Sequence, residues 1–492
     1  MADFFASLSS VREFMETRHN YIPVMSWESD VAKLASMQSV DYIRFALALL
    51  VSVPVGACVN MFKSATVRHL YAVATGFVLI YYPFGYGVIH AAPPMLVVYL
   101  AMLMVPSYCG VLAWLSCFPY LIYLHIASAS GLNWQLGLLD FTGCQMVLTL
   151  KLITLAVARQ DAWHAKRHGK ELSPYQSLFA VNKTPNPLCF MSYVFGLGNL
   201  LAGPYLEYKD YNSFMQWQGT WDPKAEKKVP SAFRYTALCF VTAFSFLALH
   251  QLLVPTWNRN LVFTGWYKDS SFVVKAISCF LLSFTCQTKF VFAWKISEAS
   301  LTLAGLNFNG WDDKTGAPLW GRYENVHFIT MLLSDSARIV VSHWNIGTAR
   351  FLRRYVYERL VPKGKKPGFP QLLATQVTSA IWHGLYPGYL LFFIGSAFWL
   401  NFATVIYKAE QALMPAGVGD TVPLKVLKIV WTHLVLNYLA TSFMVLNFNE
   451  SLEVYRSLHY LPWIIIVVGS FLFPLLLRGK SRRKERDDKK EH

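Results

Sequence analysis

Apolar segments of about 20 residues alternate with short polar ones along most of the chain. Between Arg68 and Asp140 there is no Lys, Arg, Asp or Glu, and this gap alone is long enough for three membrane crossings of about 20 residues each. The pattern predicts about nine to twelve transmembrane helices. The candidate segments are 42–60, 70–90, 92–108, 109–127, 138–158, 188–203, 233–254, 272–292, 325–341, 372–386, 388–407, 427–448 and 461–477.

The predicted fold class is an all-α, polytopic membrane protein. Segments 188–203 and 325–341 are the weakest candidates, and they can be re-entrant or buried, because irregular backbone at membrane depth needs protein or water around it. We expect an N-terminal segment at 1–40, a single membrane-integral domain at 41–477 and a basic cytosolic tail at 478–492.

Composition supports this prediction. Of the 492 residues, 54% are hydrophobic and 15% are charged, against about 25% charged in an ordinary soluble domain, which argues against a soluble enzyme. The net charge of +16 is spread unevenly and forms no nucleic-acid-binding face, so the expected partner is the lipid bilayer. The eight cysteines form no CxxC pair and no Cys/His cluster with zinc spacing, so no metal site is expected.

Three basic clusters, at 159–170, 350–366 and 478–490, predict the orientation, because short loops rich in Lys and Arg stay in the cytosol. In the second cluster, Leu352, Val356 and Leu360 share one helical stripe. The residues Arg350, Arg353 and Arg354 point away from it. This segment is either an amphipathic surface helix that meets anionic groups or an ordinary cytosolic loop.

The chain ends Lys489-Lys490-Glu491-His492. This ending resembles the dilysine retrieval signal of endoplasmic reticulum membrane proteins. It predicts a multi-pass protein of that membrane with a cytosolic C-terminus. The alternative is a simple solvated terminus.

The sharpest candidate for chemistry is the string IWHGLYPGY at 381–389, set between two apolar stretches. Polar side chains at membrane depth are costly and are the default functional candidates. The imidazole of His383 is suited to take a proton from an alcohol and pass it to a leaving group. Gly384 permits close approach of another group, and Pro387-Gly388 can break the helix. A structural role for His383 stays open at this point.

A second candidate is SHWNIGT at 342–348. The amide of Asn345 can donate to a developing oxyanion or orient a histidine, and one such donor is worth about 3 kcal/mol in a transition state. An interhelical hydrogen bond of about 0.6 to 2 kcal/mol is the structural alternative. The separation between Asn345 and His383 permits contact but does not require it.

Four ordered strings carry a family resemblance: FGLGNLLAGPYLEYKDYNSF at 195–214, KFVFAWKISEASLTLAGLNFNGWDD at 289–313, WNIGT at 344–348 and WHGLYPGY at 382–389. Together they resemble the membrane-bound O-acyltransferase family. Within it they look most like the lysophospholipid acyltransferase branch, close to the lysophosphatidylcholine acyltransferase 3 type. The resemblance covers most of the chain and is strongest from about 190 to 400.

The resemblance implies an acyl-CoA-dependent O-acyltransferase of the endoplasmic reticulum that acylates the free hydroxyl of a lysophospholipid in phospholipid remodelling. Lysophosphatidylcholine is the first expected acceptor, then lysophosphatidylethanolamine or lysophosphatidylserine. Acyl-CoA is a co-substrate, no cofactor is tightly bound, and a homo-oligomer is possible. His383 matches the family's catalytic histidine and Asn345 its partner asparagine. The family fold places both in a central intramembrane chamber.

Other residues have expected supporting roles. Trp344, Trp382, Gly384, Pro387, Gly388 and Tyr389 are expected to shape the substrate site, and Arg350, Arg353 and Arg354 to attract the phosphates of coenzyme A. Lys151 and Glu298 are charges at membrane depth, either internal ion-pair partners or lining residues.

Several alternatives remain at this point. A relative of the same family that acylates a sterol, diacylglycerol or a protein is one. A membrane transporter is another, although no internal repeat is visible. A covalent route through a cysteine is a third.

Overall fold

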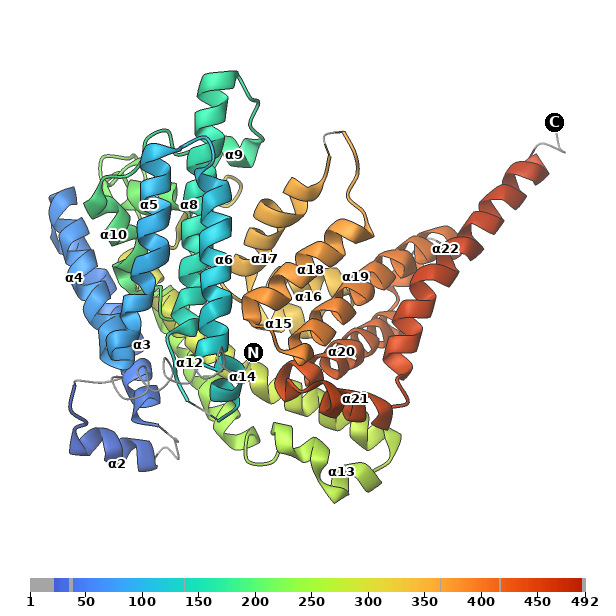
Figure 1. Cartoon of the computed structure of the whole chain (residues 1–492). Helices are drawn as coiled ribbons and strands as arrows, with labels where there is room; N and C mark the ends of the chain where they lie inside the picture. The colour runs from blue at the N-terminus through green and yellow to red at the C-terminus, as the bar shows by residue number, and fades with distance from the viewer. Residues whose placement is uncertain (1–21, 35–38, 137, 363, 416, 489–492) are drawn as a thin grey trace, which may run out of the picture. The chain divides into compact units, whose positions relative to one another are not determined.

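A computed structural model describes residues 22–34, 39–136, 138–362, 364–415 and 417–488, with side chains described through Leu475 (Figure 1). Most of the predicted N-terminal segment, the Lys489-Lys490 pair and Lys363 lie outside the described residues. Within them, the predicted all-α class is confirmed, since the only named strands form one short antiparallel hairpin. The chain divides into two compact units, Met1–Leu247 with Phe290–Asn325, and Ala248–Lys289 with Val326–His492.

The described residues contain eight helices that are long and apolar enough to cross a membrane, one fewer than the lowest expected number. A ninth crossing results if Phe448–Ser457 and Leu461–Leu475, bent by 88°, form one span. The eight are Val40–Met61, Ala65–Met104, Cys109–Ala127, Thr142–His168, Phe233–Leu253, Phe272–Ala304, Pro387–Leu413 and Val422–Val445.

The structure differs from the hydropathy pattern at four places. Segments 70–90 and 92–108 form one 40-residue span, because a 3-10 turn, η2 (Gly85–Ala91), joins α4 (Ala65–Phe84) to α5 (Ala92–Met104) without a polar break. Segment 188–203 becomes the short apolar helix Pro187–Gly198. Segment 325–341 contains α15 (Phe328–Leu332) and the start of α16 (Ala337–His343), which are too short to cross. Segment 372–386 lies mostly in α18 (Phe369–His383), a helix of 15 residues that is too short to be one of the eight.

The first unit is mainly helical, and its short hairpin follows the long helix α14. Its elements are α2 (Ser26–Leu34), α3 (Val40–Cys58), η1 (Val59–Met61), α4 (Ala65–Phe84), η2 (Gly85–Ala91), α5 (Ala92–Met104), α6 (Cys109–Ala127), α7 (Ser130–Leu136), α8 (Thr142–His168), α9 (Pro174–Phe179), α10 (Pro187–Phe195), η3 (Gly196–Gly198), α11 (Tyr208–Met215), η4 (Gly219–Trp221), α12 (Phe233–Leu253), β1 (Phe308–Trp311) and β2 (Pro318–Trp320).

The second unit carries both candidate strings, around Asn345 and around His383. Its elements are η5 (Arg259–Phe263), α13 (Gly265–Asp269), α14 (Phe272–Ala304), α15 (Phe328–Leu332), α16 (Ala337–His343), α17 (Ile346–Phe351), the π-helix η6 (Leu352–Tyr357), η7 (Glu358–Leu360), α18 (Phe369–His383), α19 (Pro387–Leu413), η8 (Val418–Asp420), α20 (Val422–Val445), α21 (Phe448–Ser457) and α22 (Leu461–Asp488). Helices α12 and α14 each continue from one unit into the other.

Glycines and side-chain amides hold the helices of the first unit close together. In the α6–α8 pair, the amide N–H of Gly110 donates to Oε1 of Gln160 at 2.8 Å, and the thiol of Cys109 donates to the carbonyl of Ala156 at 3.1 Å. Where α4 meets α10, a Cβ on Gly76 would lie 2.0 Å from the carbonyl oxygen of Phe195. Close backbone approach of this kind is the usual use of small residues between membrane helices.

The two charges expected at membrane depth have different partners. Lys151 on α8 is fully buried, and its Nζ donates to Oδ1 of Asn199 at 2.9 Å and to the carbonyl of Val194 at 3.0 Å. Glu298 on α14 forms an ion pair of 2.8 Å with Lys295. Glu298 is therefore an internal ion-pair partner, whereas Lys151 joins α8 to the turn after α10 through neutral oxygens.

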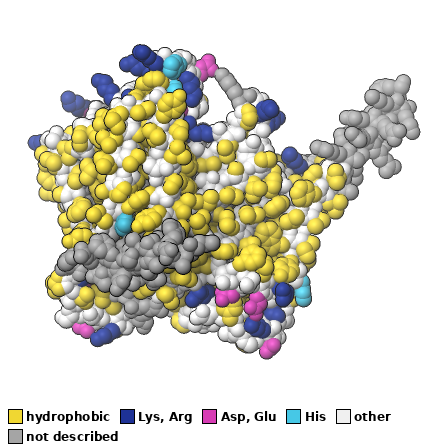
Figure 2. Space-filling view, viewed as in Figure 1, with side chains coloured by type: hydrophobic (Ala, Val, Ile, Leu, Met, Phe, Trp, Pro, Cys, Tyr) yellow, Lys and Arg dark blue, Asp and Glu magenta, His cyan; other side chains and the backbone are white. Residues whose placement is uncertain are grey.

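The outer surface of the first unit fits a lipid environment. Figure 2 shows hydrophobic side chains over the flanks of α4, α5 and α6, with Lys and Arg side chains gathered at the end where α8 leads to α9. Exposed apolar side chains on these helices include Phe77, Val78, Leu96, Leu103 and Leu115. An apolar band with basic residues at its edge is the pattern of a membrane protein.

Substituting Gly76 by Ala should destabilise the protein, because the new Cβ overlaps the Phe195 backbone, which cannot rotate away. Overpacking of this kind costs about 1 to 3 kcal/mol. A thermal melt in detergent should give a lower apparent melting temperature for Gly76→Ala. Gly143→Ala is the matched control, since Gly143 also lies in a helix and a Cβ there meets nothing within 4 Å. Equal melting of the two variants would contradict the packing argument.

Candidate active site

The candidate histidine lies where one helix ends and another begins. His383 is the last residue of α18, and the N–H of Gly384 bonds to the carbonyls of Ala380 and Ile381, each at 3.1 Å. Gly384 has φ of 127°, a backbone region that side chains other than glycine rarely adopt. Pro387 then occupies the first turn of α19, where its missing N–H costs nothing. Gly384 and Pro387 thus fix the backbone conformation between the end of α18 at His383 and the start of α19.

Gly388 anchors this break to the end of α20. Its N–H donates to the carbonyl of Leu446 at 2.8 Å, and the hydroxyl of Ser442 donates to the Gly388 carbonyl at 3.0 Å. A Cβ on Gly388 would lie 2.1 Å from the Ser442 carbonyl oxygen. The contact leaves no room for a side chain, so Gly388 serves helix packing.

Four aromatic rings surround the imidazole of His383. Trp382 and Phe443 approach it edge-on, with centroids at 4.8 and 5.1 Å, and Phe393 stacks on it at 5.1 Å with an interplanar angle of 22°. Tyr389 lies at 5.7 Å and packs on Phe443 at 4.5 Å. His383 itself is half-buried, whereas Trp382 and Tyr389 are buried. The rings restrict the orientation of the imidazole while part of it stays accessible.

Asn345 lies at a second sharp turn, between α16 and α17. It has φ of 46° and ψ of 52°, the left-handed region, and its carbonyl accepts from the N–H of Ala349 at 2.9 Å to begin α17. The preceding Trp344 pairs with Val326 in an isolated antiparallel bridge. The Asn345 side chain does not cap α17 and is half-buried. Asparagine is one of the few residues that adopts this backbone readily, so part of its identity is explained by geometry alone.

The structure places Asn345 and His383 in the same compact unit. Helix α18, which ends at His383, packs against η6, the direct continuation of α17 after Asn345. In Figure 1, α16, α17 and α18 form one group of short helices. The two candidates thus lie on elements that pack together. Trp382 and Tyr389 contact the imidazole directly, whereas Trp344 is held by its bridge to Val326.

The basic segment after Asn345 is not the regular helix that its spacing predicts. It runs from α17 through the π-helix η6 into η7, and from Phe351 onward its buried residues are Phe351, Tyr355 and Val356, whereas Leu360 is exposed. Of the expected stripe, Val356 is buried and Leu352 is half-buried, but the prediction is wrong at Leu360, because the wider π-helical turn shifts the buried face.

The arginines themselves are accessible to different degrees. Arg350 and Arg353 are exposed and Arg354 is half-buried. Arg353 pairs with Glu358 at 3.0 Å. The exposed cations leave the phosphate-attracting role expected for this segment physically feasible.

Sequence reasoning missed a polar cluster in the first unit, formed by the first family-like string and the loop after β2. Asp210 on α11 accepts from Arg322 at 3.0 Å and from the hydroxyl of Tyr323 at 2.8 Å, and the N–H of Glu207 donates to the same hydroxyl at 3.3 Å. Burial, with the nearby Asp210 and Glu207 carboxylates, raises the pKa of Tyr323 well above its usual range. The phenol stays a proton donor, and the cluster ties α11 to the loop after β2.

Sequence reasoning also missed Phe393 and Phe443. Phe393 is one of many apolar residues in α19, and Phe443 lies on another helix, far along the chain. No local signal marks either residue as a neighbour of His383. In the part of the chain that the structure describes, no group of three or more His, Cys, Asp or Glu side chains could hold a metal ion. All eight cysteines are free thiols.

Comparisons with known proteins agree with the motif resemblance. Residues 126–421 match the model of the membrane-bound O-acyltransferase family. Lysophospholipid acyltransferase 1 of Arabidopsis thaliana is 37% identical over 453 residues, which cover 92% of this chain and 97% of that protein. Lysophospholipid acyltransferase 2 of the same plant is 34% identical, covering 91% and 97%. A lysophospholipid acyltransferase of Schizosaccharomyces pombe is 31% identical, covering 70% and 69%.

The family model covers more than half of the 492 residues and includes both Asn345 and His383. The plant relatives match nearly the whole chain at more than 30% identity. The chain is a multi-pass membrane protein that belongs to the membrane-bound O-acyltransferase family.

Proposed function

We propose that this protein transfers a fatty acyl group from acyl-coenzyme A to the free hydroxyl of a lysophospholipid. The observation that carries the proposal is the half-buried imidazole of His383, held at a helix break by four aromatic rings. The names of the relatives support the lysophospholipid as acceptor. Lysophosphatidylcholine is the proposed first head group, then lysophosphatidylethanolamine or lysophosphatidylserine.

His383 acts as the general base in this proposal. A thioester is already activated toward attack, so direct transfer needs a base, an oriented alcohol and stabilisation of the tetrahedral oxyanion. The imidazole removes the proton from the lysophospholipid hydroxyl, and the alkoxide attacks the thioester carbonyl. The C–S bond breaks when the intermediate collapses, and the imidazolium returns the proton to the coenzyme A thiolate. No covalent acyl-enzyme is required.

Asn345 supplies an amide beside this reaction in the proposal, either to the oxyanion or to the imidazole. The side-chain amide of Asn345 is not used to cap α17, so helix capping does not compete with this role. The packing of α18 on η6 gives the two residues a common framework. Trp382 and Tyr389 serve as walls that restrict the imidazole.

The exposed cations of the basic segment attract the phosphates of coenzyme A in this proposal. The same segment then faces the cytosol, together with the tail, and the protein lies in the endoplasmic reticulum membrane. The basic clusters support this orientation.

His383→Ala should reduce turnover of oleoyl-CoA with lysophosphatidylcholine by at least about 100-fold, because general-base catalysis accelerates a reaction by about 10²- to 10⁴-fold. The measurement is formation of diacyl product by purified protein. His168→Gln is the control, since His168 is also a histidine but is exposed at the end of α8. A folded His383→Ala variant with unchanged turnover would refute the assignment. Activity lost on cysteine replacement instead would favour the covalent route.

Substituting Asn345 by Gly separates its backbone role from its chemical role. Glycine adopts the left-handed conformation of Asn345 without strain but lacks the amide. The variant should fold normally and lose at least about 30-fold in turnover, equivalent to about 2 kcal/mol. Asn345→Asp, which keeps the shape and removes the N–H donor, should behave similarly. Wild-type turnover in Asn345→Gly would mean that the residue serves only the turn.

Arg353→Gln should raise the KM for acyl-CoA about two- to fivefold with little change in kcat, and the difference should shrink at high salt. Arg456→Gln is the control, because Arg456 is an exposed arginine on α21. An unchanged KM in Arg353→Gln, or an equal rise in both variants, would exclude a phosphate-attracting role for Arg353.

A panel of acceptors tests the alternatives. Preferred acylation of a sterol, diacylglycerol or a peptide over lysophospholipids would replace the proposed substrate while leaving the reaction type intact. Solute flux without any acyl transfer would favour a transporter.

A further inference from the structure

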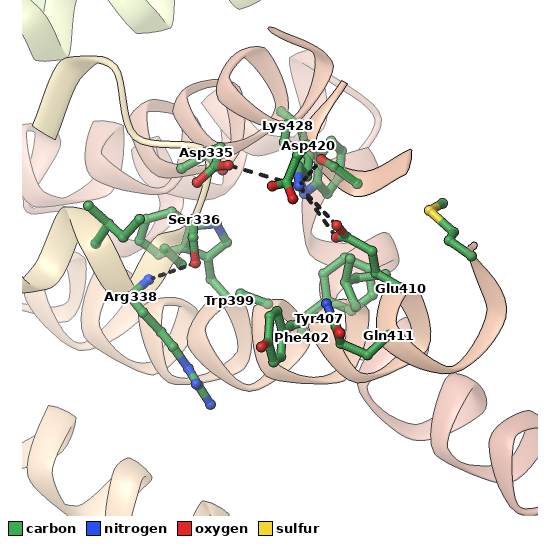
Figure 3. A pocket seen from close by; sticks show the side chains of 18 of the residues that line it. Asp335, Ser336, Arg338, Trp399, Phe402, Tyr407, Glu410, Gln411, Asp420 and Lys428 are labelled. Carbon is green, nitrogen blue, oxygen red and sulfur yellow. Dashed lines mark hydrogen bonds and ion pairs between the residues drawn. The ribbon is translucent and has the colours of Figure 1, made fainter. Parts of the chain in front are cut away.

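The second unit contains a cavity of about 600 Å³ that none of the proposed catalytic residues lines. Its walls are the start of α16, the second half of α19, the loop with η8 and the start of α20 (Figure 3). Both charged and aromatic side chains line it. A ligand bound in this cavity would therefore occupy a site separate from the proposed acyl transfer.

Negative charge exceeds positive charge at one end of the cavity. The Nζ of Lys428 lies 3.2 and 3.4 Å from the two Glu410 carboxylate oxygens and 3.9 Å from Asp335, and it donates to the Gly419 carbonyl at 2.9 Å. Asp420 lines the same end. The side chains of Glu410, Lys428 and Asp335 are only 15%, 23% and 25% exposed. The Lys428 ammonium thus faces two partly buried carboxylates, and the exposed carboxylate of Asp420 lies on the same side of the cavity, so a second cation would be stabilised there.

The lining of the cavity suits an organic cation better than a metal ion. Within the described ranges, no three acidic, His or Cys side chains are close enough together to hold a metal. Instead the cavity carries four aromatic side chains, those of Trp399, Phe402, Tyr407 and Trp431. Aromatic faces next to carboxylates are the usual surroundings of alkylammonium groups.

A cation at another wall of the cavity suits an anionic group of the same ligand. Arg338 on α16 lines the cavity, and one of its guanidinium nitrogens donates to Oγ1 of Thr404 at 2.8 Å. Figure 3 shows the Arg338 side chain extending away from the cluster of Asp335, Asp420 and Lys428. A guanidinium is well matched to phosphate oxygens. The cavity therefore offers a place for an ammonium, and the exposed guanidinium of Arg338 lies at its edge, where it can meet a phosphate.

The position of the cavity points to a lipid. It lies at the C-terminal end of α19 and the N-terminal end of α20, two helices able to cross a membrane, so it lies at a membrane surface. Apolar side chains near these helix ends are exposed, among them Leu413, Val422 and Leu427. A soluble amine has no apolar part to contact these exposed side chains, whereas the acyl chains of a lipid would lie along them.

We propose that this cavity binds the head group of a zwitterionic glycerophospholipid, with its ammonium among Asp335, Asp420 and the aromatic rings and its phosphate toward Arg338. The lipid is either a diacyl lipid of the bilayer or a lysophospholipid. Both carry the same head-group chemistry.

Native mass spectrometry of the full chain in detergent tests the proposal. The probes are phosphatidylcholine, phosphatidylethanolamine and phosphatidylglycerol at equal concentrations. The wild type should retain at least about fivefold more of the two zwitterionic lipids than of phosphatidylglycerol. The double variant Asp335→Asn with Asp420→Asn should lose this preference. The matched control is Asp269→Asn with Glu450→Gln, which also removes two carboxylates, both exposed and outside the cavity, and it should keep the preference.

Tyr407→Leu covers the case in which the double variant does not fold, because Tyr407 is 57% exposed and its replacement leaves the ion cluster intact. It should lower phosphatidylcholine retention at least about threefold. Competition with lysophosphatidylcholine identifies the source: displacement indicates a site shared with lysophospholipid, and retention of the diacyl lipid indicates a bilayer lipid. An equal preference in wild type and cavity variants, or no preference in the wild type, would overturn the proposal. The binding readout is independent of acyl transfer.

Discussion

The contact of Gly388 with the backbone of α20 is the constraint on which the candidate site depends. Two hydrogen bonds join this glycine to Leu446 and Ser442, and no Cβ fits between them. Because Gly388 is in the first turn of α19, the contact fixes where α19 begins. It thereby fixes the short break that follows His383. Phe443, in the last turn of α20 before its C-cap residue Leu446, then meets the imidazole from the side.

Both candidate residues lie where a helix is interrupted. His383 precedes a glycine with φ of 127°, and Asn345 is itself in the left-handed region. Within a membrane, such breaks are tolerated only where protein or water satisfies the backbone. At the first break, the carbonyls of Ala380 and Ile381 accept from the N–H of Gly384. At the second break, the backbone of Trp344, just before Asn345, pairs with Val326.

Much of this arrangement could be predicted from the sequence, for physical reasons. Long apolar runs marked most of the spans, and Gly384 and Pro387 marked the helix break, because their backbone limits act locally. Contacts between distant segments could not be predicted in this way. Phe443 carries no local signal of its place beside His383, and the π-helix η6 moved the buried face of the basic segment from Leu360 to Phe351 and Tyr355. The sequence did not reveal that Lys151 bonds to Asn199 and Val194 either, because these contacts depend on how α10 packs on its neighbours.

The most direct measurement of the central claim is a structure with both substrates in place. Cryo-electron microscopy of the protein with a non-hydrolysable acyl-CoA and a lysophospholipid would locate the acceptor hydroxyl. The proposed mechanism predicts this oxygen within about 3.2 Å of an imidazole nitrogen of His383, with the thioester carbonyl carbon next to it. Clear density for both ligands at a place that the His383 ring does not reach would contradict the mechanism.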